Sequence, residues 1–116
     1  MEDGIRARIA YVACCLITSK QPGSIYDHHN GQHVNMSGTV SSKKVKAYDS
    51  TNGVHFTSTL NGLYDHEKGS HITMEVKGND IKGYEYVSGS HFSGTFKDST
   101  LTLYDQGAAN HYDYIF

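Results

Sequence analysis

The segment Tyr64-Asp65-His66-Glu67-Lys68-Gly69-Ser70-His71 is one of five copies of the motif Y-[DE]-x-x-x-G-x-H. The copies begin at Tyr26, Tyr48, Tyr64, Tyr84 and Tyr104. Only the copy at Tyr104 lacks the glycine, and Ala109 stands in its place. Five copies of one short unit indicate a repeat architecture built from a single supersecondary element.

That element is predicted to be a β-hairpin. Each motif places a turn between two short runs that alternate like strands, and a second turn signal, such as Asn61-Gly62, separates one motif from the next. The repeat therefore predicts an all-β domain, an antiparallel meander of ten strands in five hairpins. The expected strands are residues 24–27, 32–40, 45–49, 54–60, 63–65, 70–76, 81–85, 90–96, 101–105 and 110–116.

Strand alternation sends the apolar residues to one face of the meander and the motif tyrosines and histidines to the other. The same parity pairs Val40 with Val45, Leu60 with Leu63, Val76 with Ile81 and Phe96 with Leu101 across the inter-repeat turns. The meander is expected to close into a barrel, and a flattened pair of packed sheets is the alternative. The apolar face comprises Val34, Met36, Val40, Val45, Ala47, Val54, Phe56, Leu60, Leu63, Ile72, Met74, Val76, Ile81, Phe92, Phe96, Leu101, Leu103, Tyr112, Tyr114 and Phe116.

The first 23 residues have a different character. Apolar residues at helical spacing predict one amphipathic helix over residues 3–18, with Arg6 and Arg8 on the face opposite the apolar one. This helix would cover one mouth of the barrel or enter its lumen. The alternative interpretation is a signal peptide or lipoprotein leader. The chain thus divides into residues 1–23, helix and linker, and residues 24–116, the five-hairpin β-domain, within one domain overall.

Composition excludes several classes of function. Ten basic and twelve acidic residues give a net charge of −2, which argues against nucleic-acid binding. The apolar run near the N-terminus is too short for a transmembrane span. The two cysteines, Cys14 and Cys15, are adjacent and unsuited to a disulfide with each other. The compartment stays open: cytoplasmic is slightly favoured, and secreted or lipid-anchored follows if residues 1–17 are a leader.

The motif tyrosines and histidines are the candidate binding residues. Cross-strand ring pairs stabilise short strands, which is a purely structural explanation of their repetition. Exposed rings also offer stacking faces and hydrogen-bond donors to a glycan, an aromatic ligand or a partner protein. The expected pairs on the outer face are Tyr26 with His33, Tyr48 with His55, Tyr64 with His71, Tyr84 with His91, and Tyr104 with His111.

The motif acids fall on the core parity, at the rim next to the turns. Acceptance of hydrogen bonds from the turn amides explains them best, and a ring of like charge that binds a cation is the alternative. No metal site is predicted for the histidines, because equivalent ones lie two strands, about 9.5 Å, apart. His28, His29 and His33 form a local group without a metal-ligand spacing. The acids are Asp27, Asp49, Asp65, Glu85 and Asp105.

No nucleophile elbow, phosphate-binding loop or zinc motif is present, and no cofactor is implied. The sequence predicts a non-enzymatic binding or assembly module that presents its exterior Tyr–His residues to a protein, a glycan or a second copy. One alternative is a small carrier that holds an apolar ligand in the barrel lumen. A second alternative is a small barrel enzyme that uses the rim carboxylates with His28 or His29. The lumen residues of the carrier alternative are Phe56, Phe92, Phe96 and Tyr112.

Overall fold

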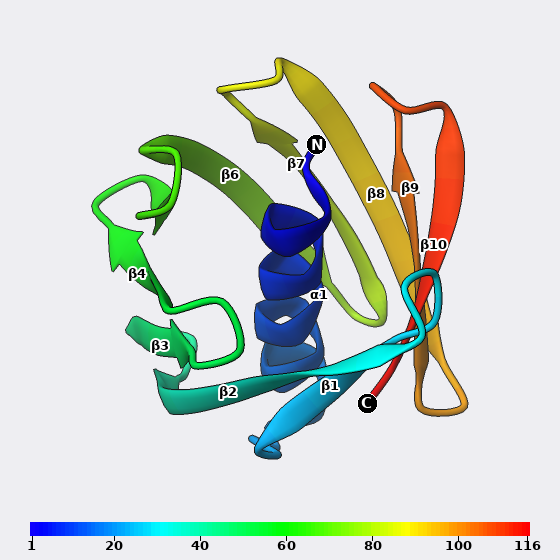
Figure 1. The fold of residues 1–116 in the computed structure, drawn as a ribbon, viewed down its shortest axis with the longest axis horizontal. Helices are drawn as coiled ribbons and strands as arrows, with labels where there is room; N and C mark the ends of the chain where they lie inside the picture. The colour runs from blue at the N-terminus through cyan, green and yellow to red at the C-terminus, as the bar shows by residue number, and fades with distance from the viewer.

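One helix is followed by ten antiparallel strands in the computed structural model, which describes residues 1–116 (Figure 1). The helix α1 spans Asp3–Thr18. Every strand lies within one residue of its predicted position. The strands are β1 Ser24–Asp27, β2 Gln32–Val40, β3 Val45–Asp49, β4 Val54–Thr59, β5 Gly62–Asp65, β6 Ser70–Lys77, β7 Asp80–Glu85, β8 Ser90–Lys97, β9 Thr100–Asp105 and β10 Asn110–Ile115.

The strands form a closed barrel in which each one pairs with its neighbours in sequence. The last strand closes the barrel on the first, with Tyr26 opposite Ile115 and Asp27 opposite Tyr114. Closure pairs every strand on both sides, so the barrel has no free edge. The predicted all-β meander with barrel closure is confirmed.

The motif turns share one backbone conformation. Gly31, Gly53, Gly69 and Gly89 all have φ between 63° and 70°, in the left-handed region that glycine enters without steric cost. Ala109 occupies the equivalent position in the fifth copy with φ 53°. The recurrent glycine is therefore explained by the backbone of the turn that joins the two strands of each hairpin.

The helix lies inside the barrel, surrounded by strands (Figure 1). It contacts β1, β2, β6 and β9, and all residues from Ile5 to Cys15 are buried. Barrel diameter grows with strand number, and eight strands already enclose a lumen that side chains fill. Ten strands leave room for a helix, on which the small residues Ala7, Ala10 and Ala13 are buried. The helix is thus the core of the barrel.

The prediction that Arg6 and Arg8 lie on a polar helix face was wrong. Their exposed fractions are 3% and 0%. A helix packed inside a barrel has no solvent face, so a charged side chain on it must find a partner in the wall. The partners are described below.

The prediction that Leu60 belongs to the apolar face and pairs with Leu63 was also wrong. Leu60 is 97% exposed, and Ser58 stands opposite Leu63 instead. The turn is centred on Leu60 and Asn61, because Gly62 is already part of β5. Gly62 is needed for close packing: a Cβ there would lie 2.2 Å from the carbonyl oxygen of Ile72 in β6.

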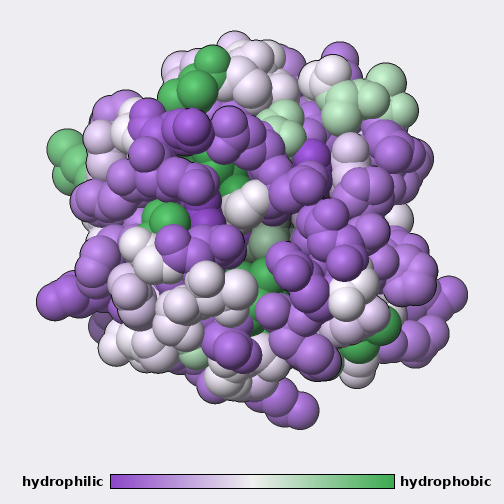
Figure 2. All heavy atoms as spheres, in the orientation of Figure 1, coloured by the Kyte–Doolittle hydropathy of each residue, from purple (hydrophilic) through white to green (hydrophobic).

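Hydrophilic residues cover most of the face shown in Figure 2, and hydrophobic residues form separate small spots on it. The exposed large hydrophobic residues are Leu60, Tyr86, Val87 and Ile115. No helix of the structure has the length and apolar character needed to cross a membrane.

Candidate functional site

The five motif tyrosines each stand directly opposite the motif histidine of the same hairpin, on the outside of the barrel. We call these ten residues the Tyr–His belt. The ring centroids are 4.9, 4.7, 4.9, 4.6 and 4.6 Å apart in chain order. The belt pairs are Tyr26–His33, Tyr48–His55, Tyr64–His71, Tyr84–His91 and Tyr104–His111.

The two members of each pair differ in exposure and in role. The tyrosines are half-buried and the histidines are exposed. The tyrosine hydroxyl lies over the turn: that of Tyr64 is 3.0 Å, and that of Tyr84 3.3 Å, from where a Cβ would stand on Gly69 and Gly89. In four of the five hairpins the tyrosine therefore covers the backbone of its own turn, which is a structural role. The exposed imidazoles have no such role in the turn.

Two further rings, those of His66 and Tyr86, pack against belt residues and were not among the predicted pairs. His66 packs against Tyr64, with ring centroids 4.7 Å apart, and its Nε2 lies 2.9 Å from Thr57 Oγ1. Tyr86 packs against Tyr84 in the same way, with centroids 4.7 Å apart. Both residues occupy the third position of the motif. Strand parity places that position on the outer face, so the signal was present in the sequence.

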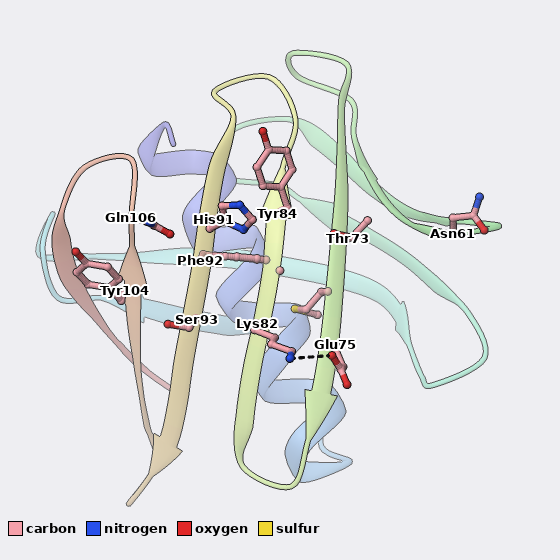
Figure 3. A pocket seen from close by; sticks show the side chains of 12 residues that line it. Asn61, Thr73, Glu75, Lys82, Tyr84, His91, Phe92, Ser93, Tyr104 and Gln106 are labelled. Atoms are coloured by element: carbon pink, nitrogen blue, oxygen red, sulfur yellow. Dashed lines mark ion pairs between the residues drawn. The ribbon is translucent and has the colours of Figure 1, made fainter.

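A groove crosses the outer face of the barrel beside the belt (Figure 3). One part of about 750 Å³ includes Tyr84, His91 and Tyr104 from the belt. An adjoining part of about 590 Å³ reaches His111 on β10. The two parts share Glu75, Lys82, Ser93 and Tyr104, and we call them together the β6–β10 groove.

Polar side chains and one ion pair line the groove away from the rings. Lys82 Nζ lies 3.6 Å from Glu75 Oε2, and Figure 3 marks this pair. Thr95 donates a hydrogen bond to Asp80 at 2.9 Å, and Thr102 donates one to Asp113 at 2.8 Å. Ser93 stands between the rings and the ion pair (Figure 3). The groove thus combines aromatic edges with hydroxyl and charged groups.

Inside the barrel, the motif acids are buried instead of lying at an open rim. Their exposed fractions are 2% or less. Each accepts a hydrogen bond from an amide of its own turn, as expected. The donors are Asn30 to Asp27, Asn52 to Asp49, Glu67 to Asp65, Ser88 to Glu85 and Gly107 to Asp105.

The cations that face these carboxylates come from the N-terminal segment of the same chain. The Arg8 guanidinium lies 2.8 Å from Asp49, 2.6 Å from Asp65 and 2.8 Å from Glu67. Arg6 and the N-terminal ammonium meet Asp105 at 3.4 and 2.9 Å. The helix is therefore fixed in the lumen by buried ion pairs to three motif acids.

Hydrogen bonds and nearby charges lower the pKa values of two buried motif acids, Glu85 and Asp105. Burial opposes ionisation of Glu85, but hydrogen bonds from Ser70, Ser88 and two turn amides outweigh it and lower the pKa of this carboxyl. Burial acts the same way on Asp105, where the N-terminal ammonium, the Ala108 amide and Arg6 lower the pKa. Both groups are charged at neutral pH, and both are sealed from solvent.

The two cysteines are buried, free thiols on the helix. Burial raises the pKa of Cys14 to about 12 and that of Cys15 to about 11, and for Cys14 the charge of the neighbouring thiol adds to the shift. The thiolate is the reactive form of cysteine, so these thiols are protonated and unreactive at neutral pH.

The residues named for the two alternative functions lie mostly in the interior of the barrel. Phe56 and Phe92 belong to the core that surrounds α1, so the helix occupies the space that a lumen carrier would need. Phe96 is packed against that core, and Tyr112 lies under the Arg6 guanidinium, 3.6 Å from its ring centroid. The carboxylates of the enzyme alternative are buried, whereas His28 and His29 are exposed.

The histidines are not gathered around a metal position. His29 packs against Tyr112 with ring centroids 5.0 Å apart, whereas His33 packs against Tyr26. No group of three or more His, Cys, Asp or Glu side chains has the geometry to hold a metal ion.

No protein-family model matches this sequence, and no curated protein or solved structure matches it either.

Proposed function

We propose that this chain is a non-enzymatic binding or assembly module that presents the Tyr–His belt to a glycan or to a second copy of itself. The observation that carries the proposal is the exposure of five imidazoles in a row around the barrel, each beside an aromatic ring. Ring-rich exposed surfaces are typical of binding interfaces.

The division of roles within each pair supports the proposal. The tyrosine is accounted for by its contact with the turn, so the repeat of one hairpin explains its recurrence. An exposed histidine adds at most about 0.2–1 kcal/mol as a cross-strand partner. Its recurrence at one outward position in all five hairpins is therefore better explained by contact with a ligand.

The burial of the polar interior groups also supports a function of the exterior. The motif acids, the two arginines and the thiols are all buried, and three of the acids hold the helix through ion pairs, so the exterior is the surface available for binding. The β6–β10 groove lies on that exterior and includes belt residues from the last two hairpins.

The test compares a triple variant, His55→Ala, His71→Ala and His91→Ala, with the unmodified protein. The histidines are chosen because their exposure makes them dispensable for folding. Self-association is measured by analytical ultracentrifugation, and retention is measured on insoluble cellulose, chitin and xylan. We expect the unmodified protein to self-associate or to be retained, and the triple variant to lose that property.

The matched control is the triple variant Ser42→Ala, Lys43→Ala and Asn79→Ala, which alters exposed residues of the inter-repeat turns, outside the belt. It should behave like the unmodified protein. Equal self-association and equal retention of the histidine variant and the unmodified protein would refute the proposal, and so would an unmodified protein that neither self-associates nor is retained.

A further inference from the structure

The β6–β10 groove is the place beside the belt where two adjoining hollows share lining residues. Along β8, Ser93 follows His91 at the next outward position, where its small side chain leaves open space between the rings and the ion pair (Figure 3). The neighbouring inward position on β7 is Gly83, which has no side chain and lies against the Phe92 ring. Small residues thus form a trough with walls of different chemistry.

One wall consists of aromatic rings, and the other consists of charged groups that neutralise one another. Tyr84, His91 and Tyr104 line the turn side of the trough. Glu75 and Lys82 pair with each other on the other side, and Asp80 accepts a hydrogen bond from Thr95. Lys77 is the remaining basic residue that lines the groove.

This balance selects the charge of the ligand. A phosphate or a nucleic acid needs a surplus of basic groups, which a site with two lysines and two acids does not offer. A purely apolar ligand would displace water from the hydroxyls and from the ion pair without replacing the hydrogen bonds to that water, which costs free energy. An uncharged ligand with many hydroxyl groups satisfies both walls.

The length of the groove indicates the shape of its ligand. Tyr84 and Tyr104 occupy equivalent positions two strands apart, about 9.5 Å at the usual strand spacing. From β6 to β10 the groove crosses four strand-to-strand steps of about 4.8 Å, which amount to about 19 Å along the curved barrel wall. A single sugar ring is much shorter than this trough, whereas an extended chain of several rings fills it.

We infer that the β6–β10 groove binds an extended, uncharged oligosaccharide, whose rings lie against His91 and the exposed parts of Tyr84 and Tyr104 and whose hydroxyls meet Ser93 and the Glu75–Lys82 pair. This inference rests on the proposed function, because it assigns the ligand class to one part of the Tyr–His belt. It also goes beyond it, since it places the ligand on the last hairpins and not on the whole belt.

The experiment titrates the full chain with cellohexaose and chitohexaose, which are uncharged, and with hexagalacturonate, which is anionic. Binding is followed by calorimetry and by tyrosine fluorescence, which no tryptophan obscures because the chain has none. We expect at least one uncharged hexasaccharide to bind. We expect hexagalacturonate to bind at least about tenfold more weakly, a difference of about 1.4 kcal/mol.

Two variants locate the site. Ser93→Arg fills the trough, and Asn35→Arg places the same side chain at the equivalent position of the first hairpin, two residues after its motif histidine. Both residues are exposed. Ser93→Arg should weaken hexasaccharide binding at least about tenfold, and Asn35→Arg should leave it within about twofold.

The outcomes separate this inference from the proposed function. Equal effects of the two arginine variants, preferential binding of hexagalacturonate, or no binding of either uncharged hexasaccharide would overturn the inference. The proposed function survives any of these results if the histidine triple variant still abolishes self-association or retention, and it fails separately if that variant has no effect.

Discussion

At the scale of single residues, Arg8 is the side chain on which the interior depends most. It neutralises Asp49 and Asp65 in a place that water does not reach. Burial lowers the pKa of an arginine, but the carboxylates around Arg8 outweigh burial and raise its pKa. The group is a permanent cation, so its removal leaves two buried carboxylates without a cation beside them.

We therefore predict that Arg8→Met destabilises the protein by about 3–5 kcal/mol, the usual cost of removing one partner from a buried ion pair. Urea unfolding measures this loss. Lys82→Met is the control, because it removes an exposed ion pair worth about 0–1 kcal/mol. Should Arg8→Met be too unstable to fold, Arg8→Lys keeps the charge and is expected to fold with an intermediate loss. Equal losses in Arg8→Met and Lys82→Met would contradict the account of the interior.

Ala109 is the one position where a motif residue conflicts with its backbone. It adopts φ 53°, and the left-handed region costs a residue with a side chain about 1–2 kcal/mol. Glycine loses more entropy on folding, which offsets part of this gain. We predict that Ala109→Gly raises the free energy of unfolding by about 0.5–1 kcal/mol.

The neighbouring Ala108→Gly is the control for Ala109→Gly. Ala108 is not among the residues with positive φ, so glycine there should destabilise the protein slightly. Thermal unfolding of both variants gives the comparison. A lower melting temperature for Ala109→Gly than for the unmodified protein would show that the fifth turn does not need the glycine.

At the scale of elements, the β4–β5 hairpin shows how a turn signal can be right about the element and wrong about the register. Asn61-Gly62 predicted the two central residues of a turn, yet the turn is centred one residue earlier. The structure uses Gly62 because β6 passes against its backbone, not because the turn requires positive φ. A contact between strands outweighed a local preference.

We accordingly predict that Gly62→Ala destabilises the barrel by about 1–3 kcal/mol, because the new Cβ would stand 2.2 Å from the Ile72 carbonyl oxygen and force β5 and β6 apart. Gly23→Ala is the control: nothing lies within 4 Å of a Cβ there, and its change should stay within about 0.5 kcal/mol. Urea midpoints report both values. A Gly62→Ala change no larger than the control change would mean that the strands can separate at little cost.

At the scale of the whole molecule, the buried carboxylates make stability depend on pH. The pKa values of Glu85 and Asp105 are lowered from their ordinary values of 4.5 and 3.8. A carboxyl whose pKa is lower in the folded state stabilises the fold above its unfolded pKa, and this contribution is lost as pH falls through the folded value.

We predict that the free energy of unfolding is nearly constant from neutral pH down to about 5 and then falls as the pH decreases further. Urea unfolding at a series of pH values measures the slope. Glu85→Gln should be less stable at neutral pH and should show a shallower decline in acid, because one of the titrating groups is gone. An unchanged slope in this variant would show that Glu85 does not contribute.

The amino-acid sequence was sufficient to predict the ten strands, their order and their inward and outward faces, and it favoured a closed barrel over two packed sheets. These features follow from alternation with a period of two residues and from turns of a few residues, both of which are local. It also determined that the Tyr–His belt lies outside, because parity assigns each ring to a face. The outward position of His66 and Tyr86 follows from the same parity, although the third position of the motif is variable and was not predicted as part of the belt.

The position of the helix, the carboxylates that meet Arg6 and Arg8, and the hollows of the exterior could be seen only in the folded chain. The helical period of residues 3–18 is compatible with a helix over the mouth or inside the lumen. The choice depends on whether ten closed strands leave enough space and on whether two arginines find acids in the wall. Both conditions depend on contacts between residues far apart in the chain, and such contacts exist only once the barrel has closed.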